Sequence, residues 1–278
     1  MKDRAYAKIN LSLDVFNIRE DGYHDIRSIM LPIDFYDELE INIADKDSYW
    51  CNKSYIRFNE HNSIIKMISI LKDKYHITDH HDVKLNKCVP IKAGLGGGTA
   101  DGASVLRIFR KMYKLDISDE EIKDICLKVG ADVPFNYYNY PALVSGIGDE
   151  IEKIDVLKEY YVLIVKPKLG VSTKQAYELL DMERCDHPDI DRLKEALENG
   201  EAIEGLLGNS LEQPSMLLNK DIEIIKNKMK EFGGKNILMS GSGSAVFCID
   251  EDKECIRRLY DAFKNSKYYV RFTKTLNR

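Results

Sequence analysis

Hydrophobic and polar positions follow two kinds of spacing in the first part of the chain. Apolar residues alternate with polar ones over 38–43, which predicts a half-buried strand. Over 64–75 they recur at helical spacing after Asn62 or Ser63, either of which can cap a helix. A second alternating run, 83–89, predicts another strand. The first part therefore mixes strands and helices.

A glycine-rich segment, residues 90–101, follows the second strand. After it, apolar residues recur at helical spacing from Ala103 to Tyr113, which predicts a helix. A further helix is predicted after Ser118, because Ser118 and Glu121 form a capping box. The glycine-rich segment is thus expected to join a strand to a helix N-terminus.

The second part of the chain has a different order of elements. We expect strands over 160–166, 236–240, 245–249 and 268–273, with helices over 222–232 and 256–263. Apart from additional helices, this is the β-α-β-β-α-β order of ferredoxin-like domains. The sequence predicts an α+β protein with two domains, 1–156 and 157–278, and a ferredoxin-like second domain.

Composition and charge exclude several classes of protein. The 278 residues carry a formal net charge of -5 without a block of basic residues, which argues against nucleic acid or an anionic membrane as a partner. The six cysteines show no C-x-x-C pair and no zinc-like spacing. The N-terminus leads into no apolar signal region. We expect a cytoplasmic protein, either a monomer or a weak homodimer.

The glycine-rich segment predicts a phosphate-binding loop. It has four glycines in the five positions 94–98, which allow positive φ angles and close approach of backbone N–H groups to a ligand. A helix N-terminus adds positive potential there. Thr99 offers a hydroxyl for a phosphate oxygen or its magnesium ion. The segment matches neither the P-loop nor the dinucleotide-binding motif, and protein-kinase signatures are absent.

The segment resembles the second motif of the GHMP kinases, P-x-x-x-G-L-G followed by small residues and alanine. Other parts of the chain are similar to this family too. They are Ala7-Lys8-Ile9-Asn10-Leu11, Asp21-Gly22-Tyr23-His24, Gly130-Ala131-Asp132-Val133-Pro134-Phe135, Ser145-Gly146-Ile147-Gly148-Asp149-Glu150, Gly170-Val171-Ser172-Thr173-Lys174-Gln175-Ala176-Tyr177 and Met239-Ser240-Gly241-Ser242-Gly243-Ser244-Ala245. The resemblance spans nearly the whole chain.

The resemblance implies the fold and the cosubstrates. The fold would have two lobes, the first like domain 2 of ribosomal protein S5 and the second ferredoxin-like. The cosubstrates would be ATP and magnesium, with no direct metal ligand assigned. The acceptor would be an alcohol that carries a cytidine diphosphate group. ATP would be bound by Pro90, Gly94, Leu95, Gly96, Gly97, Gly98 and Thr99.

The resemblance also implies roles for other residues. Asp132 would be the general base, and Lys8 would keep its carboxylate ionised and offset charge on the transferred group. The acceptor would be bound by Asn10, Tyr23, His24, Thr173 and Tyr177. Ser240, Gly241 and Gly243 would lie at the rim of the site. Without the resemblance, Asp132 is better explained as a turn residue and Lys8 as a surface lysine.

Alternatives remain open at the level of sequence. One is another GHMP kinase, of the mevalonate or homoserine type, and another is a non-catalytic ligand sensor on the same fold. Met30 stands where an aromatic residue is expected, Gly102 where alanine is more usual, and Asn136 where a second apolar residue is common. Asn209-Ser210-Leu211-Glu212 resembles a family string for which the sequence indicates no chemistry.

Overall fold

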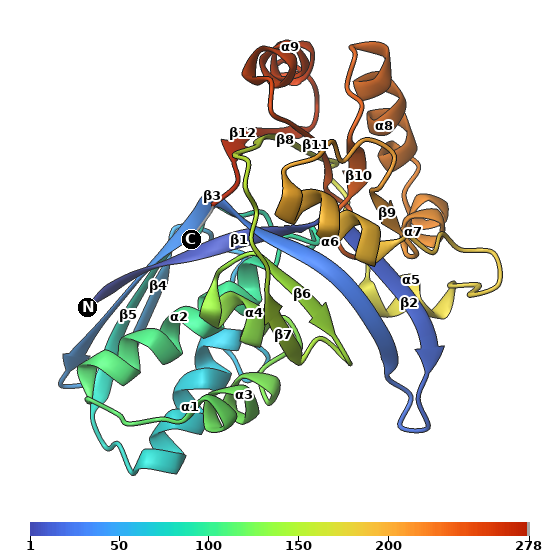
Figure 1. Cartoon of the computed structure of the whole chain (residues 1–278). Coiled ribbons are helices and arrows are strands. Elements are labelled where there is room, and N and C mark those ends of the chain that lie inside the picture. Colours follow the sequence, from blue (N-terminus) through green and yellow to red (C-terminus); the bar gives the residue numbers. More distant parts are fainter. Residues whose placement is uncertain (277–278) are drawn as a thin grey trace. The chain divides into compact units, whose positions relative to one another are not determined.

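The computed structural model describes residues 1–276, and Figure 1 labels its strands and helices. In chain order they are β1 (Lys2–Asn10), β2 (Ser12–Ile18), β3 (His24–Ala44), β4 (Ser48–Cys51), α1 (Ser63–Tyr75), β5 (His80–Asn86), α2 (Gly97–Met112), α3 (Asp119–Leu127), α4 (Val133–Tyr138), β6 (Ala142–Ser145), β7 (Glu150–Lys153), β8 (Tyr161–Lys166), α5 (Thr173–Glu178), α6 (Ile190–Asn199), β9 (Gly208–Asn209), α7 (Glu212–Leu218), α8 (Asp221–Glu231), β10 (Ile237–Met239), β11 (Val246–Asp250), α9 (Lys253–Phe263) and β12 (Tyr269–Lys274).

Internal contacts divide the chain into two compact units. The first unit comprises residues 1–7, 35–90 and 96–139, and the second comprises 8–34, 91–95 and the chain from Tyr140 onward. The units interleave along the sequence because β1 and β3 each contribute residues to both. The domain boundary expected at 156 and 157 remains a prediction.

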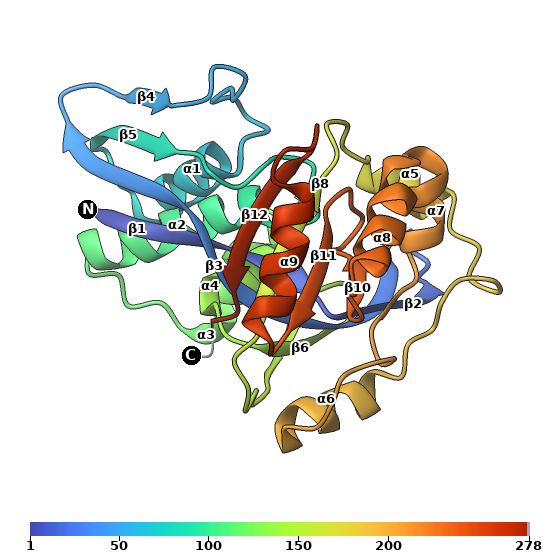
Figure 2. The same ribbon diagram turned by 90° about the horizontal axis from the view of Figure 1, so that it is seen from above.

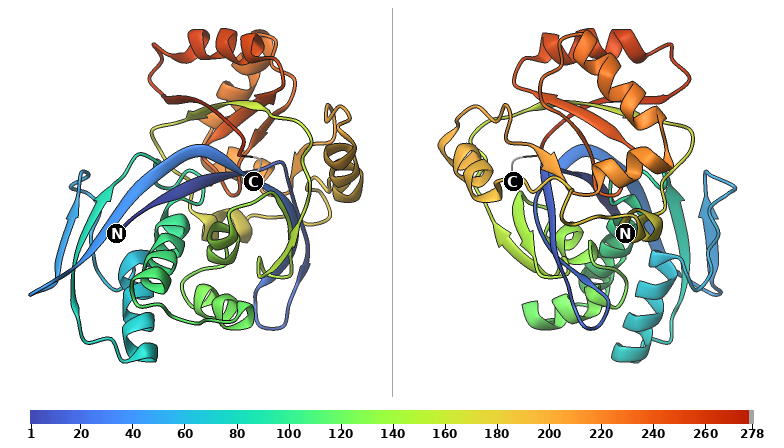
Figure 3. Two further views of the ribbon diagram at one scale, coloured as in Figure 1. Left: turned by 60° about the vertical axis from the view of Figure 1, so that its left-hand side comes forward. Right: turned by 90° about the vertical axis from the view of Figure 1, so that its right-hand side faces the viewer.

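The first unit packs helices on strands. β5 pairs antiparallel with the end of β3 and parallel with β4. Helices α1, α2 and α3 bury their apolar residues against the inward side chains of these strands, such as Leu39 and Val83. Figure 3 shows these helices, coloured cyan to green, on one side of the blue and teal strands. The alternation of apolar and polar residues at 38–43 and 83–89 thus correctly predicted that these segments bury one of their two faces.

The glycine at position 102 has a packing reason. A Cβ atom there would lie 3.2 Å from the Ser63 Cβ and 3.3 Å from the Ser63 carbonyl oxygen, both tighter than ordinary contacts. Ser63 is the first residue of α1, and the N-cap is Asn62, one of the two residues predicted as candidates. Gly102 therefore allows α2 to approach the start of α1, which offsets its lower helix preference.

The second unit contains the predicted ferredoxin-like domain. Its four-stranded sheet has the order β10-β11-β8-β12, and the pairs between neighbouring strands are antiparallel. Figure 2 shows α8 and α9 lying over this sheet. Apolar residues at helical spacing, such as Ile222, Ile225, Ile256 and Leu259, are buried in the core between them. The predicted β-α-β-β-α-β order is confirmed.

The remaining strands of the second unit include several that the hydrophobic pattern did not predict. The start of β3 pairs antiparallel with β2 and β6, β6 pairs with β7, and β2 pairs parallel with β9. Residues 29–33 of β3 are buried on both faces, so no alternation marks them as a strand. Within residues 1–276, no helix is long and apolar enough to cross a membrane.

Candidate active site

The downstream end of the glycine loop lies in the first unit, where it forms the N-terminus of α2. Gly96 is the N-cap residue, with a left-handed φ of 67°. The Thr99 hydroxyl donates a hydrogen bond to the Gly96 carbonyl oxygen over 2.8 Å. The first N–H groups of a helix have no intrahelical acceptor, and the helix dipole is positive there. This end of the loop can bind an anion such as a phosphate group.

The upstream part of the loop, residues 91–95, lies in the second unit against the turn between β10 and β11. The backbone N–H of Ala245 donates to the Ala93 carbonyl oxygen, and the Ser240 hydroxyl donates to the Gly94 carbonyl oxygen. A Cβ atom at Gly94 would lie 1.9 Å from the Ser240 carbonyl oxygen. Only glycine allows this approach, since Gly94 also has a φ of 73°.

Lys8 is held near the same turn, at the end of β1. Its side chain is 3% exposed, and Nζ donates to Asn10 Oδ1 over 2.6 Å. Asn10 in turn donates from Nδ2 to the Ser28 hydroxyl. A Cβ atom at Gly241 would lie 3.4 Å from Lys8 Nζ. Lys8 is therefore a positioned, buried cation, and its interpretation as a surface lysine is wrong.

The string Asn209-Ser210-Leu211-Glu212 has a structural explanation in the same unit. Asn209 Nδ2 donates to the carbonyl oxygens of Met239 and Gly241, and a Glu212 carboxylate oxygen accepts the Met239 backbone N–H. Lys226 forms an ion pair with Glu212. These contacts fix the turn that carries Ser240 and Gly241, so Asn209 and Glu212 support a loop of the site.

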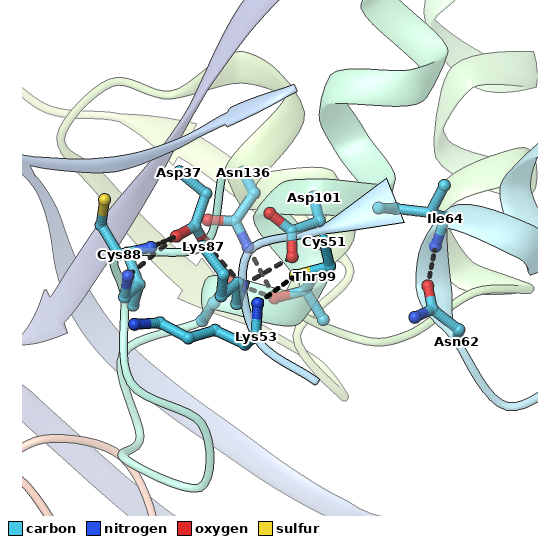
Figure 4. Close-up of polar contacts among 12 residues, drawn as sticks. Asp37, Cys51, Lys53, Asn62, Ile64, Lys87, Cys88, Thr99, Asp101 and Asn136 are labelled. Carbon is cyan, nitrogen blue, oxygen red and sulfur yellow. Dashed lines mark hydrogen bonds and ion pairs between the residues drawn. The ribbon is translucent and has the colours of Figure 1, made fainter. Parts of the chain in front are cut away.

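Asp132 lies in the first unit, at the N-cap position of α4, and is half-buried. Asn136 connects it to the glycine loop. Asn136 Nδ2 donates to the Asp132 carbonyl oxygen over 2.9 Å and to the Thr99 hydroxyl over 2.8 Å. Figure 4 shows Asn136 next to Thr99. The residue predicted as the base is thus linked, through its backbone carbonyl oxygen, to the predicted phosphate loop. The sequence marked Asn136 only as a polar departure.

A buried charge cluster, formed by Asp37, Lys87 and Asp101, lies behind the same loop. Lys87 Nζ donates to an Asp37 oxygen over 2.6 Å and to an Asp101 oxygen over 2.5 Å. No more than 5% of any of the three residues is exposed. Figure 4 shows Lys87 between the two carboxylates. Sequence reasoning missed this cluster because its members are far apart along the chain.

The pKa of Asp101 gives a testable dependence of stability on pH. Burial, assisted by the Asp37 carboxylate and only partly offset by the Lys87 ammonium, raises this pKa to about 8. An unfolded aspartate has a pKa of about 3.9. The folded chain therefore binds more protons between these values, and this carboxyl group makes stability fall as pH rises from about 4 to about 8.

Asp101→Asn is expected to remove this contribution. The free energy of unfolding of Asp101→Asn, relative to the parent, should increase between about pH 5 and about pH 8.5. Urea unfolding at several pH values measures the difference. A difference that stays constant with pH would contradict the raised pKa of Asp101.

The residues predicted to bind the acceptor all belong to the second unit. The ring centroids of His24 and Tyr177 are 4.7 Å apart, and burial lowers the pKa of His24. The hydroxyls of Thr173 and Ser242 are 2.7 Å apart, so the former contacts the turn between β10 and β11. Tyr23 is 59% exposed and can reach a ligand only from solvent.

Met30, which replaces the expected aromatic residue, is 2% exposed and lies in the core. It sits on β3 opposite Ala142 of β6.

Within residues 1–276, no group of three or more His, Cys, Asp or Glu side chains could hold a metal ion.

Comparison with known proteins agrees with the two units and with the glycine loop. The model of the GHMP kinases N terminal domain matches residues 62–140, and that of the GHMP kinases C terminal region matches residues 181–270. The first of these matches includes the glycine loop and Asp132. The chain belongs to the GHMP kinase family and is an enzyme of the kinase class.

Relatives define the group within that family. The chain is 39% identical to the 4-diphosphocytidyl-2-C-methyl-D-erythritol kinase of Clostridium beijerinckii, over 99% of this chain and 100% of the relative. It is 35% identical to the enzyme of that name from Bacillus cytotoxicus, over 94% and 92% of the two chains. The chain thus belongs, within the GHMP kinases, to the 4-diphosphocytidyl-2-C-methyl-D-erythritol kinase family.

Solved structures agree on the fold. A crystal structure of 4-(cytidine 5'-diphospho)-2C-methyl-D-erythritol kinase matches with a TM-score of 0.85 and 27% identity, covering both chains completely. The homoserine kinase of Cytophaga hutchinsonii matches with a TM-score of 0.73 and 16% identity, over 98% of this chain and 94% of that one. The predicted two-lobed α+β GHMP kinase fold is confirmed.

Proposed function

We propose that this chain transfers the γ-phosphoryl group of ATP to the 2-hydroxyl of 4-diphosphocytidyl-2-C-methyl-D-erythritol, a step in the non-mevalonate synthesis of isoprenoid precursors. The observation that carries the proposal is the hydrogen-bonded group of Thr99, Asn136 and Asp132. It links a helix N-terminus suited to phosphate with the backbone of Asp132, the residue whose carboxylate would accept the proton. The names of the full-length relatives supply the acceptor.

The nucleotide phosphates would be bound by the glycine loop. Gly96 to Thr99 present backbone N–H groups at the start of α2, and these donors are oriented before the ligand arrives. Pro90, Gly94 and Leu95 shape the approach to them. Magnesium would accompany the nucleotide and neutralise part of the phosphate charge. The protein then contributes mainly position and fixed dipoles.

Proton transfer would involve Asp132. The acceptor hydroxyl oxygen attacks the γ-phosphorus, its proton passes to the Asp132 carboxylate, and the bond between the γ-phosphorus and the bridging oxygen breaks to release ADP. The Lys8 ammonium, oriented by Asn10, would stabilise negative charge on the transferred group. We infer that Lys8 and Asp132 act on the same reacting group.

The acceptor would be selected by the second unit. Cytosine is planar, so the adjacent His24 and Tyr177 rings can stack on it or donate hydrogen bonds to it. Tyr23 would contact the base from the solvent side. Asn10 and Thr173 can bond to the diphosphate or the erythritol hydroxyls. Together these groups favour a cytidine diphosphate alcohol over a small, base-free alcohol.

An acceptor-panel assay tests the proposal. Purified protein with ATP and magnesium is offered 4-diphosphocytidyl-2-C-methyl-D-erythritol, mevalonate or homoserine, and ADP release is followed by a coupled assay. We expect release with the cytidine-containing acceptor alone. Release with mevalonate or homoserine alone would favour another GHMP kinase activity. Binding of ATP and acceptor without release would favour a ligand sensor.

A further inference from the structure

The buried charge cluster of Asp37, Lys87 and Asp101 has no role in the chemistry described above. The side-chain carboxyl groups of Asp37 and Asp101 share one ammonium group, and Asp101 Oδ1 has no hydrogen-bond partner among the described residues. Removing such charges from water is costly, and apolar residues of similar size often stabilise a fold equally well or better. Stability alone therefore gives a poor reason for this cluster.

The cluster connects the two chain segments that flank the glycine loop. Upstream, an Asp37 oxygen accepts the backbone N–H groups of Cys88 and Val89 over 2.6 and 2.8 Å. Downstream, Asp101 lies in the second turn of α2 and accepts from Lys87. Lys87 itself follows the end of β5. Lys87 thereby links three parts of the chain. They are β3, the segment that enters the loop, and helix α2, which follows the loop.

Gly97, the first residue of α2, rests directly on this cluster. A Cβ atom at Gly97 would lie 3.2 Å from Lys87 Nζ and 2.8 Å from the Val89 Cγ1. The position of Lys87 thus determines how closely the start of α2 approaches the end of β5. The backbone N–H groups that would bind phosphate belong to this same turn, from Gly97 to Thr99.

We propose that Asp37, Lys87 and Asp101 are positioning residues for the nucleotide phosphates, because they fix the first turn of α2 relative to the chain that enters the glycine loop. The inference rests on the proposed function. Oriented donors bind an anion more tightly than mobile ones, since less order is lost on binding. Weakening the link to α2 should therefore reduce affinity for phosphate groups without altering the rest of the ligand's contacts.

Two variants of similar size separate this role from a purely structural one. Asp101→Leu removes the acceptor for Lys87 but leaves the lysine paired with Asp37, so no cation is left without a partner. Asp101→Asn keeps an acceptor oxygen at the same place. Lys84→Met is the control, because Lys84 is an exposed lysine of β5 that pairs with Asp82 at the surface.

Calorimetric titration with three probes gives the answer. The probes are a non-hydrolysable ATP analogue, inorganic tripolyphosphate and adenosine. We expect Asp101→Leu to lower the affinity for the two phosphate-containing probes by about tenfold or more, as for a lost charge-assisted hydrogen bond. Adenosine affinity should stay within about twofold of the parent. Asp101→Asn and Lys84→Met should bind all three probes like the parent.

The melting temperature of Asp101→Leu provides the second readout. It should equal or exceed that of the parent, because a buried carboxyl group has been removed. A folded Asp101→Leu that binds tripolyphosphate like the parent would overturn the proposal. An equal loss of affinity for adenosine and for the ATP analogue would also overturn it, because the substitution would then not act on the binding of the phosphates.

Two further provisions keep the test decisive. If Asp101→Leu does not fold, the double variant Lys87→Met with Asp101→Leu replaces it under the same criteria, since Asp37 retains its two backbone donors. The two proposals also fail separately. A parent that releases no ADP with any acceptor refutes the proposed function, whereas normal turnover with unchanged phosphate affinity in Asp101→Leu refutes only the positioning role.

Discussion

Asp132→Asn is expected to lower kcat by about 10²- to 10⁴-fold, the usual contribution of a general base. The amide has the size of the carboxylate but cannot accept the hydroxyl proton. The contacts between Asn136 and the Asp132 backbone use the carbonyl oxygen and are unaffected by the change. The KM for ATP should therefore stay close to that of the parent. Steady-state kinetics with saturating acceptor measure both constants.

Asp124→Asn is a matched control for this change. Asp124 is an exposed residue of α3 in the same unit, so its replacement should leave kcat unaltered. Melting temperatures of both variants close to that of the parent would show that the fold is intact. An Asp132→Asn enzyme that keeps most of its kcat would rule out Asp132 as the base.

Lys8→Met is expected to lower kcat by about 10²- to 10³-fold, the range found when one preorganised donor to developing charge is removed. Methionine keeps much of the length of the side chain and lacks its charge. Asn10 holds the Lys8 ammonium over 2.6 Å, so the charge is fixed before substrate binds. Adding acceptor at higher concentration should not restore the rate, because the loss concerns the transition state.

Lys230→Met serves as the comparison for Lys8→Met. Lys230 is an exposed lysine on α8 in the same unit, and its loss should not change kcat. If Lys8→Met raised only the KM of the acceptor and left kcat unchanged, Lys8 would be a binding residue instead of a stabiliser of the transferred phosphoryl group.

The hydrophobic pattern predicted the elements whose faces differ in polarity. The helix predicted over 64–75 is present as α1, and the strand predicted over 83–89 is present as β5, although β5 covers residues 80–86. The pattern did not predict residues 29–33 of β3, where both faces are buried, or the two-residue strand β9. These strands depend on pairing partners far away in sequence, which local spacing does not reveal.

Some residues of the candidate site could be identified from the sequence, and others only from the structure. The resemblance identified Lys8 and Asp132 because each stands in a recognisable string. Asn136 and Lys87 were not identified, since their importance comes from hydrogen bonds to residues that are 37 and 50 positions away. Met30 stands where the family resemblance led us to expect an aromatic residue, and its burial assigns it to the core. Sequence motifs found the groups that react, whereas packing determines which groups hold them.

Phosphorus-31 NMR of the reaction product tests the central claim most directly. The parent enzyme is incubated with ATP, magnesium and 4-diphosphocytidyl-2-C-methyl-D-erythritol, and the acceptor is then isolated. The proposed function predicts one new phosphomonoester signal that shows no coupling to a proton, because the carbon at position 2 carries the methyl group and no hydrogen. The cytidine diphosphate signals should be retained, and ADP should be formed in equal amount. ADP formed together with free phosphate, and an acceptor that carries no new phosphorus, would contradict it.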